Sequence, residues 1–227
     1  MRPMVKRLFR IFLLSIAICL TLPCAAWGED YLHEATGVLF PETLATLKRG
    51  RVADFESDHP GLGIGINYDG TGIRVTIYAY TSGMEVIPED LNSPVLREHF
   101  RQIIGDVMQA EKRGWIQNLE KISEGEIIWD ETRMTPKSLH ASFRFVKKGS
   151  RRLSHIYLMA YKNHFIKVRL SYDKTDQAAL ENLQKKILGE LGNILNEVSR
   201  RKQTKRPKQK FDTSYVSHMR SSTSSGK

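Results

Sequence analysis

The sequence predicts an α+β domain in which an antiparallel β-sheet of about six strands is packed by two long amphipathic helices. Three observations support this fold class. Residues 140–172 alternate apolar and polar side chains with the two-residue period of a half-buried sheet. Residues 73–80 alternate in the same way after a glycine-containing turn. Two further segments, 93–113 and 175–198, repeat apolar side chains at helical spacing.

The first 28 residues are typical of an export signal. Four basic residues precede the apolar run 11–22, and small residues follow it. We expect a Sec-type signal peptide over residues 1–28, cleaved after Ala26 or Gly28, and therefore a periplasmic or secreted protein. The alternative is an uncleaved anchor, but about twelve apolar residues are fewer than the roughly 20 that span a bilayer.

Both cysteines of the chain, Cys19 and Cys24, lie within this signal segment. Neither follows a small residue, so we do not expect a lipoprotein. After cleavage the chain has no thiol for a disulfide, a catalytic thiolate or a thiolate metal site. We expect residues 29–198 to form a single domain that is stabilised by its own hydrophobic core.

The first half of the domain contains a hairpin and a less certain segment. Residues 40–55 are ambiguous between a helix and a strand pair, and we interpret them as a turn of helix followed by a strand. Residues 61–68 and 73–80 are predicted strands joined by Asp-Gly-Thr-Gly. Glycines 61, 63 and 65 are not expected to bind phosphate, because no helix follows them; a close approach of another element explains them better.

A helix is predicted to start at Ser93, with Pro94 in its first turn, and to stop at Gly114. Residues 115–122 and 125–133 are expected to return as two strands. The last helix, 175–198, places leucine and isoleucine side chains on one side and should dock on a face of the sheet.

Residues 140–172 are expected to form three strands of an antiparallel meander. Pairing Lys147 with Arg152 and Tyr161 with Phe165 gives the predicted register. It collects one apolar face from all three strands: Leu139, Ala141, Phe143, Phe145, Ile156, Leu158, Ala160, Ile166, Val168, Leu170 and Tyr172. The opposite face is mixed and is a possible binding face, because aromatics beside cations suit a partner or an acidic ligand. Its members are Tyr157, Met159, Tyr161, Phe165, Lys167 and Arg169. The alternative is that a helix covers this face.

The net charge of +10 is carried by the two ends of the chain. Residues 29–198 hold 22 basic and 24 acidic side chains, a net charge of −2, so no nucleic-acid partner is expected. We expect residues 199–227 to be a disordered polybasic and serine-rich tail, either a solubilising extension or a tether to an anionic membrane surface. The tether residues are Arg200, Arg201, Lys202, Lys205, Arg206, Lys208 and Lys210.

No motif in the sequence specifies a reaction. In the predicted register His155 lies opposite Arg144 and His140 opposite Met159, so we expect no metal site and no cofactor. The acidic pairs at 124/126 and 130/131 are interpreted as surface carboxylates. A catalytic triad cannot be inferred from the residue types present.

The order of elements suggests a family. An antiparallel sheet with a Ser-Pro-initiated helix, a last hairpin Leu-Met-Ala-Tyr-Lys-Asn-His-Phe-Ile-Lys-Val-Arg-Leu-Ser-Tyr and a C-terminal helix resembles the Mog1/PsbP-like α-β sandwich over residues 37–198. The chain also resembles exported bacterial proteins of unassigned function at Pro-Gly-Leu-Gly and Val-Thr-Ile-Tyr-Ala-Tyr. The resemblance implies a non-catalytic accessory or binding protein with an envelope partner. The alternative is a small periplasmic hydrolase or metal-dependent enzyme.

Overall fold

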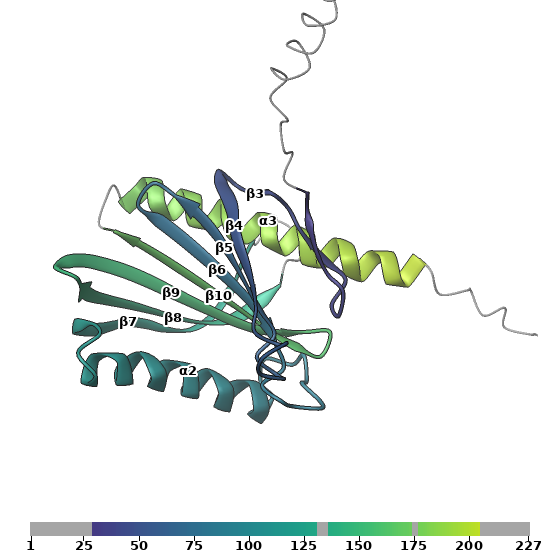
Figure 1. Cartoon of the computed structure of the whole chain (residues 1–227), viewed down its shortest axis with the longest axis horizontal. Coiled ribbons are helices and arrows are strands. Elements are labelled where there is room, and N and C mark those ends of the chain that lie inside the picture. Colours follow the sequence, from purple (N-terminus) through teal and green to yellow (C-terminus); the bar gives the residue numbers. More distant parts are fainter. Residues whose placement is uncertain (1–28, 131–135, 174–176, 205–227) are drawn as a thin grey trace, which may run out of the picture. The chain divides into compact units, whose positions relative to one another are not determined.

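The computed structural model describes residues 29–130, 136–173 and 177–204. The predicted signal segment lies outside these residues. The elements, in chain order, are β1 (Tyr31–His33), β2 (Val38–Phe40), β3 (Thr43–Leu44), β4 (Leu47–Asp54), β5 (Ile64–Gly70), β6 (Ile73–Tyr80), α2 (Pro94–Lys112), β7 (Gln117–Ile128), β8 (Lys137–Lys147), β9 (Ser150–Tyr161), β10 (His164–Asp173) and α3 (Gln177–Thr204) (Figure 1).

Eight strands form one antiparallel sheet in the order β3-β4-β5-β6-β10-β9-β8-β7, and β1 pairs with β2 in a separate ribbon. The described residues therefore contain ten strands, and the prediction of about six was too low. The missed strands β1, β2 and β3 have two or three residues each, which is too short for an alternating pattern to be recognised. The predicted α+β class, the antiparallel pairing and the two long helices are confirmed.

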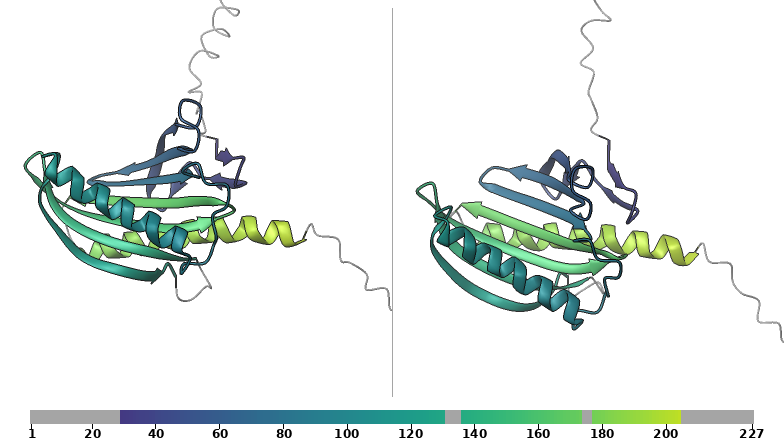
Figure 2. Two further views of the ribbon diagram at one scale, coloured as in Figure 1. Left: turned by 90° about the horizontal axis from the view of Figure 1, so that it is seen from below. Right: turned by 60° about the horizontal axis from the view of Figure 1, so that its bottom comes forward.

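Helices α2 and α3 cover opposite faces of the large sheet (Figures 1 and 2). On one face Leu96 and Phe100 of α2 belong to a core with side chains of β8 and β9. On the other face Ile187 and Leu191 of α3 belong to a second core with side chains of β5, β6 and β10. The middle strands consequently bury both of their faces, and residues 156–161 are buried without interruption.

Helix α2 has the ends that its sequence predicts. The Ser93 side chain accepts a hydrogen bond from the amide of Leu96 at 3.2 Å, and Pro94 occupies the first turn. After the helix, Gly114 adopts a φ of +72°, the left-handed conformation that ends many helices. Helix α3 is longer than predicted and ends at Thr204.

The prediction of a helical turn within residues 40–55 was wrong. Phe40, Leu44 and Leu47 are buried at a spacing that imitates a helix, yet they belong to β2, β3 and β4. A tight turn brings them to the same side, since Ala45 has a φ of +56° and Glu190 of α3 accepts a hydrogen bond from its amide at 2.5 Å.

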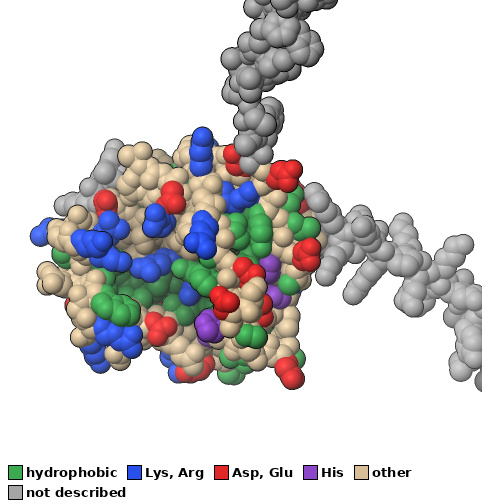
Figure 3. Space-filling model, viewed as in Figure 1, with side chains coloured by type: hydrophobic (Ala, Val, Ile, Leu, Met, Phe, Trp, Pro, Cys, Tyr) green, Lys and Arg blue, Asp and Glu red, His purple; other side chains and the backbone are tan. Residues whose placement is uncertain are grey.

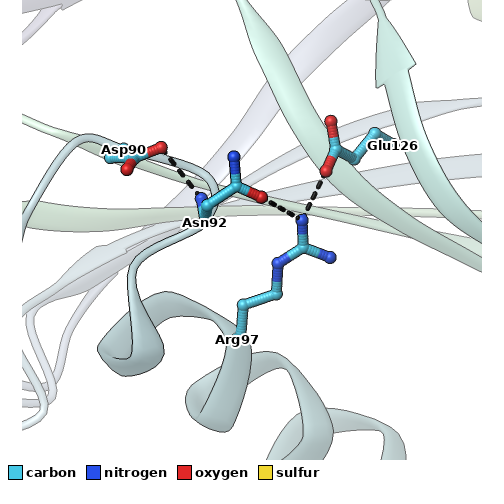
Figure 4. Close-up of polar contacts among 4 residues, drawn as sticks. All are labelled: Asp90, Asn92, Arg97 and Glu126. Carbon is cyan, nitrogen blue, oxygen red and sulfur yellow. Dashed lines mark hydrogen bonds and ion pairs between the residues drawn. The ribbon is translucent and has the colours of Figure 1, made fainter.

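The two strands predicted over 115–122 and 125–133 are one edge strand, β7, with register shifts after Gln117 and Lys121. Residues 131–133 lie outside the described residues. Arg97 attaches α2 to this strand, because its guanidinium donates to Asn92 Oδ1 at 2.7 Å and pairs with the carboxylate of Glu126 (Figure 4). Asp90 accepts from the Asn92 amide at 2.9 Å and fixes the loop before the helix (Figure 4).

The glycines at 61 and 63 are required by close approach of the chain, as the sequence predicts. Both have positive φ, and a Cβ on Gly63 would overlap the carbonyl oxygen of Ala79. The Glu56 carboxylate accepts hydrogen bonds from the amides of Gly61 at 2.9 Å and Gly63 at 2.7 Å, and these bonds lower its pKa. The amides that a phosphate would need are therefore already bonded to an anion of the same chain.

The last two hairpins have shorter turns than predicted. Lys147 pairs with Ser150, and Tyr161 pairs with His164. Each turn has two residues with positive φ, at 148–149 and 162–163, as type I′ turns require. The register between β8 and β9 differs from the prediction by two residues and keeps its faces. The register between β9 and β10 differs from the prediction by one residue. Each side chain of β10 therefore lies on the face of the sheet opposite to the predicted one.

Candidate functional site

The six residues predicted to form one binding face lie on two faces of the sheet. Tyr157, Met159 and Tyr161 belong to the buried core beneath α3, whereas Phe165 is buried beneath α2. The one-residue difference in register between β9 and β10 causes this division, because neighbouring residues of a strand point to opposite sides. Lys167 and Arg169 remain accessible, on the α2 side of the sheet.

A groove runs along the part of this side that α2 leaves uncovered. It consists of two adjoining hollows of about 280 and 510 Å³, which share Tyr78, Lys147 and Arg169 in their walls. We call it the basic groove and define it by Arg74, Tyr78, Lys147, Arg152, Lys167 and Arg169. In Figure 3, Lys and Arg side chains gather around a hollow that has hydrophobic side chains on its floor.

Three cations of the basic groove have no ion pair within the described parts of the chain. Arg74 pairs with Asp69 at 2.5 Å and Arg152 with Asp173 at 3.1 Å. No such pair is found there for Lys147 of β8 or for Lys167 and Arg169 of β10. Their positive charges face the hollows together with the carboxylate of Asp106, which favours the charged form of Lys167.

Lys167 is held against aromatic rings at the bottom of the basic groove. Its ammonium nitrogen lies 4.4 Å from the ring centre of Tyr78 and 5.3 Å from that of Tyr80. Burial, and then the nearby charge of Arg169, lower the pKa of Lys167. An anion bound beside it would offset the same repulsion, so the geometry favours a negatively charged ligand.

One end of the basic groove is apolar. Trp115 borders the smaller hollow together with Val107 and Ala110 of α2, and 63% of its surface is exposed. The guanidinium of Arg113 lies 5.2 Å from the centre of its ring. A ligand here meets an aromatic surface at one end and cations at the other. This combination suits a carboxylate or phosphate group attached to an aromatic or apolar body.

The opposite side of the sheet holds a histidine pair that the sequence analysis missed. His140 lies opposite Tyr157 and His155 opposite Ser142, not opposite the residues predicted. Nε2 of His140 lies 3.1 Å from Nδ1 of His155, and Nε2 of His155 lies 3.1 Å from the Tyr172 hydroxyl. The alternation of strand residues alone would have placed these rings on one face, but the wrong turn lengths kept them apart.

Burial lowers the pKa of both histidines to about 4, so they are neutral at pH 7. Their rings are nearly parallel, with centres 5.3 Å apart. No group of three potential metal ligands occurs within residues 29–130, 136–173 and 177–204. The pair together with Tyr172 is best described as an uncharged hydrogen-bonded row.

The acidic pairs noted in the sequence do not converge on a site within the described residues. Glu124 pairs with Lys121 at 2.6 Å and Glu126 with Arg97, all on the protein surface. Asp130 borders a cavity beneath α3, and Glu131 lies outside the described residues.

The predicted tether lies largely beyond the described residues. The backbone of Arg200, Arg201 and Lys202 continues helix α3. The other tether residues lie outside the described residues: Lys205, Arg206, Lys208 and Lys210. In the part of the chain that the structure describes, none of the helices has both the length and the hydropathy needed to cross a membrane.

Comparison with known proteins identifies similar architectures. No family model matches the sequence, and no curated protein matches it. Among solved structures, the PsbP protein of Synechocystis sp. PCC 6803 is 14% identical, with 75% of this chain and 96% of that chain covered and a TM-score of 0.46. The Ran-binding protein Mog1p of Saccharomyces cerevisiae is 11% identical over 72% of this chain and 86% of its own, with a TM-score of 0.31.

LpqN, described as involved in cell envelope biogenesis of Mycobacterium tuberculosis, is 12% identical over 68% of this chain and 83% of its own, with a TM-score of 0.25. The predicted resemblance to Mog1 and PsbP proteins is thus confirmed at the level of architecture.

Proposed function

We propose that the chain is an exported accessory protein that binds an anionic ligand in the basic groove and catalyses no reaction. The observation that carries the proposal is the convergence of Lys147, Lys167 and Arg169, without ion pairs among the described residues, beside the aromatic rings of Tyr78 and Trp115. The export-signal pattern of residues 1–28 supports a location in the periplasm or outside the cell.

The groove suits binding better than catalysis. Its cations supply attraction and orientation, but the described residues offer no nucleophile beside a base within it. Ser154 and Ser171 share a hydrogen bond at 3.0 Å, and each borders one of the hollows. Neither serine is hydrogen-bonded to a histidine within the described residues. The chemistry of the groove is therefore recognition of charge and shape.

Anilinonaphthalene sulfonate, an aromatic anion that fluoresces when it leaves water, tests the proposal. The protein is produced from the full sequence and purified after export, and its first residue is determined. We expect saturable fluorescence that inorganic pyrophosphate or citrate displaces. The variant Lys167→Gln/Arg169→Gln should bind at least tenfold more weakly, since each lost charge-assisted contact contributes about 1.5–3 kcal/mol.

Arg101→Gln is the matched control, because Arg101 is an exposed residue of α2 that pairs with Glu98 within the same helix. It should bind the probe as the unchanged protein does. Equal binding by the groove variant and the control would contradict the proposal, as would an increase in affinity on adding salt.

The predicted partners remain part of this proposal. The polybasic stretch that begins at Arg200 supports contact with an anionic membrane surface, since each Lys or Arg near such a surface contributes about 1 kcal/mol. The groove would then receive its ligand at the envelope, either from a partner protein with acidic side chains or as a free small anion.

A further inference from the structure

A second cavity lies on the opposite side of the sheet from the basic groove. It has a volume of about 780 Å³ and lies between the strands β7–β10 and the first half of α3. This volume is within the range of small-molecule sites in proteins. None of the six residues that define the basic groove lines this cavity, although Tyr172 borders both the cavity and the larger hollow of the groove.

Part of the wall of this cavity is aliphatic. Ile127, Leu153 and Leu188 line it, and Ile122 and Ile128 stand at its border with 45% and 43% of their surfaces exposed. Two exposed β-branched side chains on one edge strand leave apolar surface in contact with water. A ligand with an aliphatic body would remove that surface from water, at about 25 cal/mol per Å².

The floor of the cavity is polar but uncharged. It is formed by His155 and Tyr172, which are joined by the 3.1 Å contact between Nε2 and the hydroxyl. Burial keeps the imidazole neutral and raises the pKa of the phenol, so both groups exchange hydrogen bonds without carrying charge. An ion has no countercharge at this floor, whereas a hydroxyl or carbonyl oxygen finds a partner.

The charged residues around the cavity are of both signs. Arg144 pairs with Glu120 at 2.8 Å, Glu181 and Lys185 lie one helical turn apart on α3, and Asp130 also borders the cavity. This balance differs from the basic groove, where cations predominate. It gives the mouth of the cavity no preference for an anion or a cation.

We infer that this cavity binds an uncharged amphiphile, with its aliphatic chain against the isoleucine and leucine walls and one hydroxyl or ester carbonyl on the His155 and Tyr172 pair. The site lacks the cations that define the basic groove and does not depend on the function proposed for that groove. Fatty alcohols and neutral acyl esters belong to this chemical class.

Trp129 provides a local reporter. It borders the cavity, is buried, and donates from Nε1 to Ser138 Oγ at 2.8 Å. The variant Trp27→Phe/Trp115→Phe removes the other two tryptophans of the sequence, so that Trp129 supplies the emission whichever cleavage site is used. The probe is 11-bromoundecanol, whose bromine quenches tryptophan on contact. We expect saturable quenching that undecanol reverses, and no reversal by undecanoate or an undecyl ammonium salt at equal concentration.

The variant Tyr172→Phe, made in the same background, keeps the ring and removes the hydroxyl. It should weaken binding about fivefold, which corresponds to one hydrogen bond of about 1 kcal/mol. Tyr78→Phe is the matched control on the opposite side and should leave the affinity unchanged. Absence of saturable quenching, displacement by the charged compounds, or equal affinity in Tyr172→Phe would each overturn the inference. Lys167→Gln/Arg169→Gln should leave this binding intact, which separates it from the groove.

Discussion

Nε2 of His140 and Nδ1 of His155 lie 3.1 Å apart on the neighbouring strands β8 and β9, and neither ring carries a charge at neutral pH. One nitrogen of this contact must donate and the other accept. Protonation of both rings would place two donors against each other. The pair therefore couples the stability of the α3 side of the sheet to pH.

The first prediction concerns this dependence on pH. Burial lowers the pKa of each histidine from the ordinary 6.5 to about 4, so the unfolded chain takes up protons first as pH falls. The contribution to stability is complete above pH 6.5 and is lost as the pH falls toward 4. At pH 5 the loss is roughly 2 kcal/mol for each histidine.

Urea denaturation at pH 7 and pH 5 measures this effect. The variant His140→Gln/His155→Gln should lose clearly less free energy of unfolding between these two pH values than the unchanged protein. His59→Gln, at an exposed position, serves as the control and should behave as the unchanged protein. Parallel losses in all three proteins would rule out the coupling.

A second prediction follows from Gly63. Its φ is +60°, and an added Cβ would overlap the backbone of Ala79. Gly63→Ala should therefore lower the free energy of unfolding by about 2–4 kcal/mol, from conformational strain plus displacement of β6. Gly125→Ala is the matched control, because nothing lies within 4 Å of its added Cβ. Denaturation midpoints of the two variants, compared at pH 7, decide the point; similar midpoints would refute it.

Asn163 gives a third prediction. It has a φ of +61° in the turn before β10, its Oδ1 accepts from the amide of Ile87 at 2.8 Å, and its Nδ2 donates to the carbonyl of Glu85 at 2.8 Å. Asn163→Gly retains the turn conformation and removes both bonds, so stability should fall by about 1–2 kcal/mol. Hydrogen exchange should show faster amide exchange at Ile87 than in the unchanged protein. Unaltered protection at that amide would count against the assignment.

The fourth prediction concerns the polybasic tail. Replacing Lys205, Arg206, Lys208 and Lys210 by glutamine should strongly reduce co-sedimentation with anionic vesicles at low salt, because about 1 kcal/mol is lost for each charge near the surface. Neutral vesicles provide the control and should sediment neither protein. Undiminished binding of the variant to anionic vesicles would exclude the tether.

Much of the fold could be predicted from local sequence. Ser93, Pro94 and Gly114 define the ends of α2 through side-chain and backbone preferences that act within a few residues. The hairpin of β5 and β6 follows from its alternation and its glycines. Phe40, Leu44 and Leu47 misled the prediction. Buried residues at this spacing can come from one helix, but they can also come from three short strands that pack onto one core.

Which residues meet in the candidate sites depends on the lengths of two turns, and the sequence did not determine these lengths. Lys-Asn at 162–163 and Lys-Gly at 148–149 permit turns of two residues, but longer loops were equally consistent with the neighbouring polar residues. The two-residue error in the β8–β9 register left the predicted faces of β9 correct. The one-residue error in the β9–β10 register assigned the side chains of β10 to the wrong faces. The histidine pair and the basic groove appeared once these two registers were known.

The two-residue turn at Lys162–Asn163 also sets the register of β10 against β9. If β10 docked one residue out of step, Lys167 and Arg169 would enter the dry interior beneath α3, while Val168 and Leu170 would meet water. Burial of two unpaired cations costs several kcal/mol, so this misaligned register is disfavoured relative to the native one. The difference in polarity between the two faces of β10 thus also disfavours a one-residue slip of this strand.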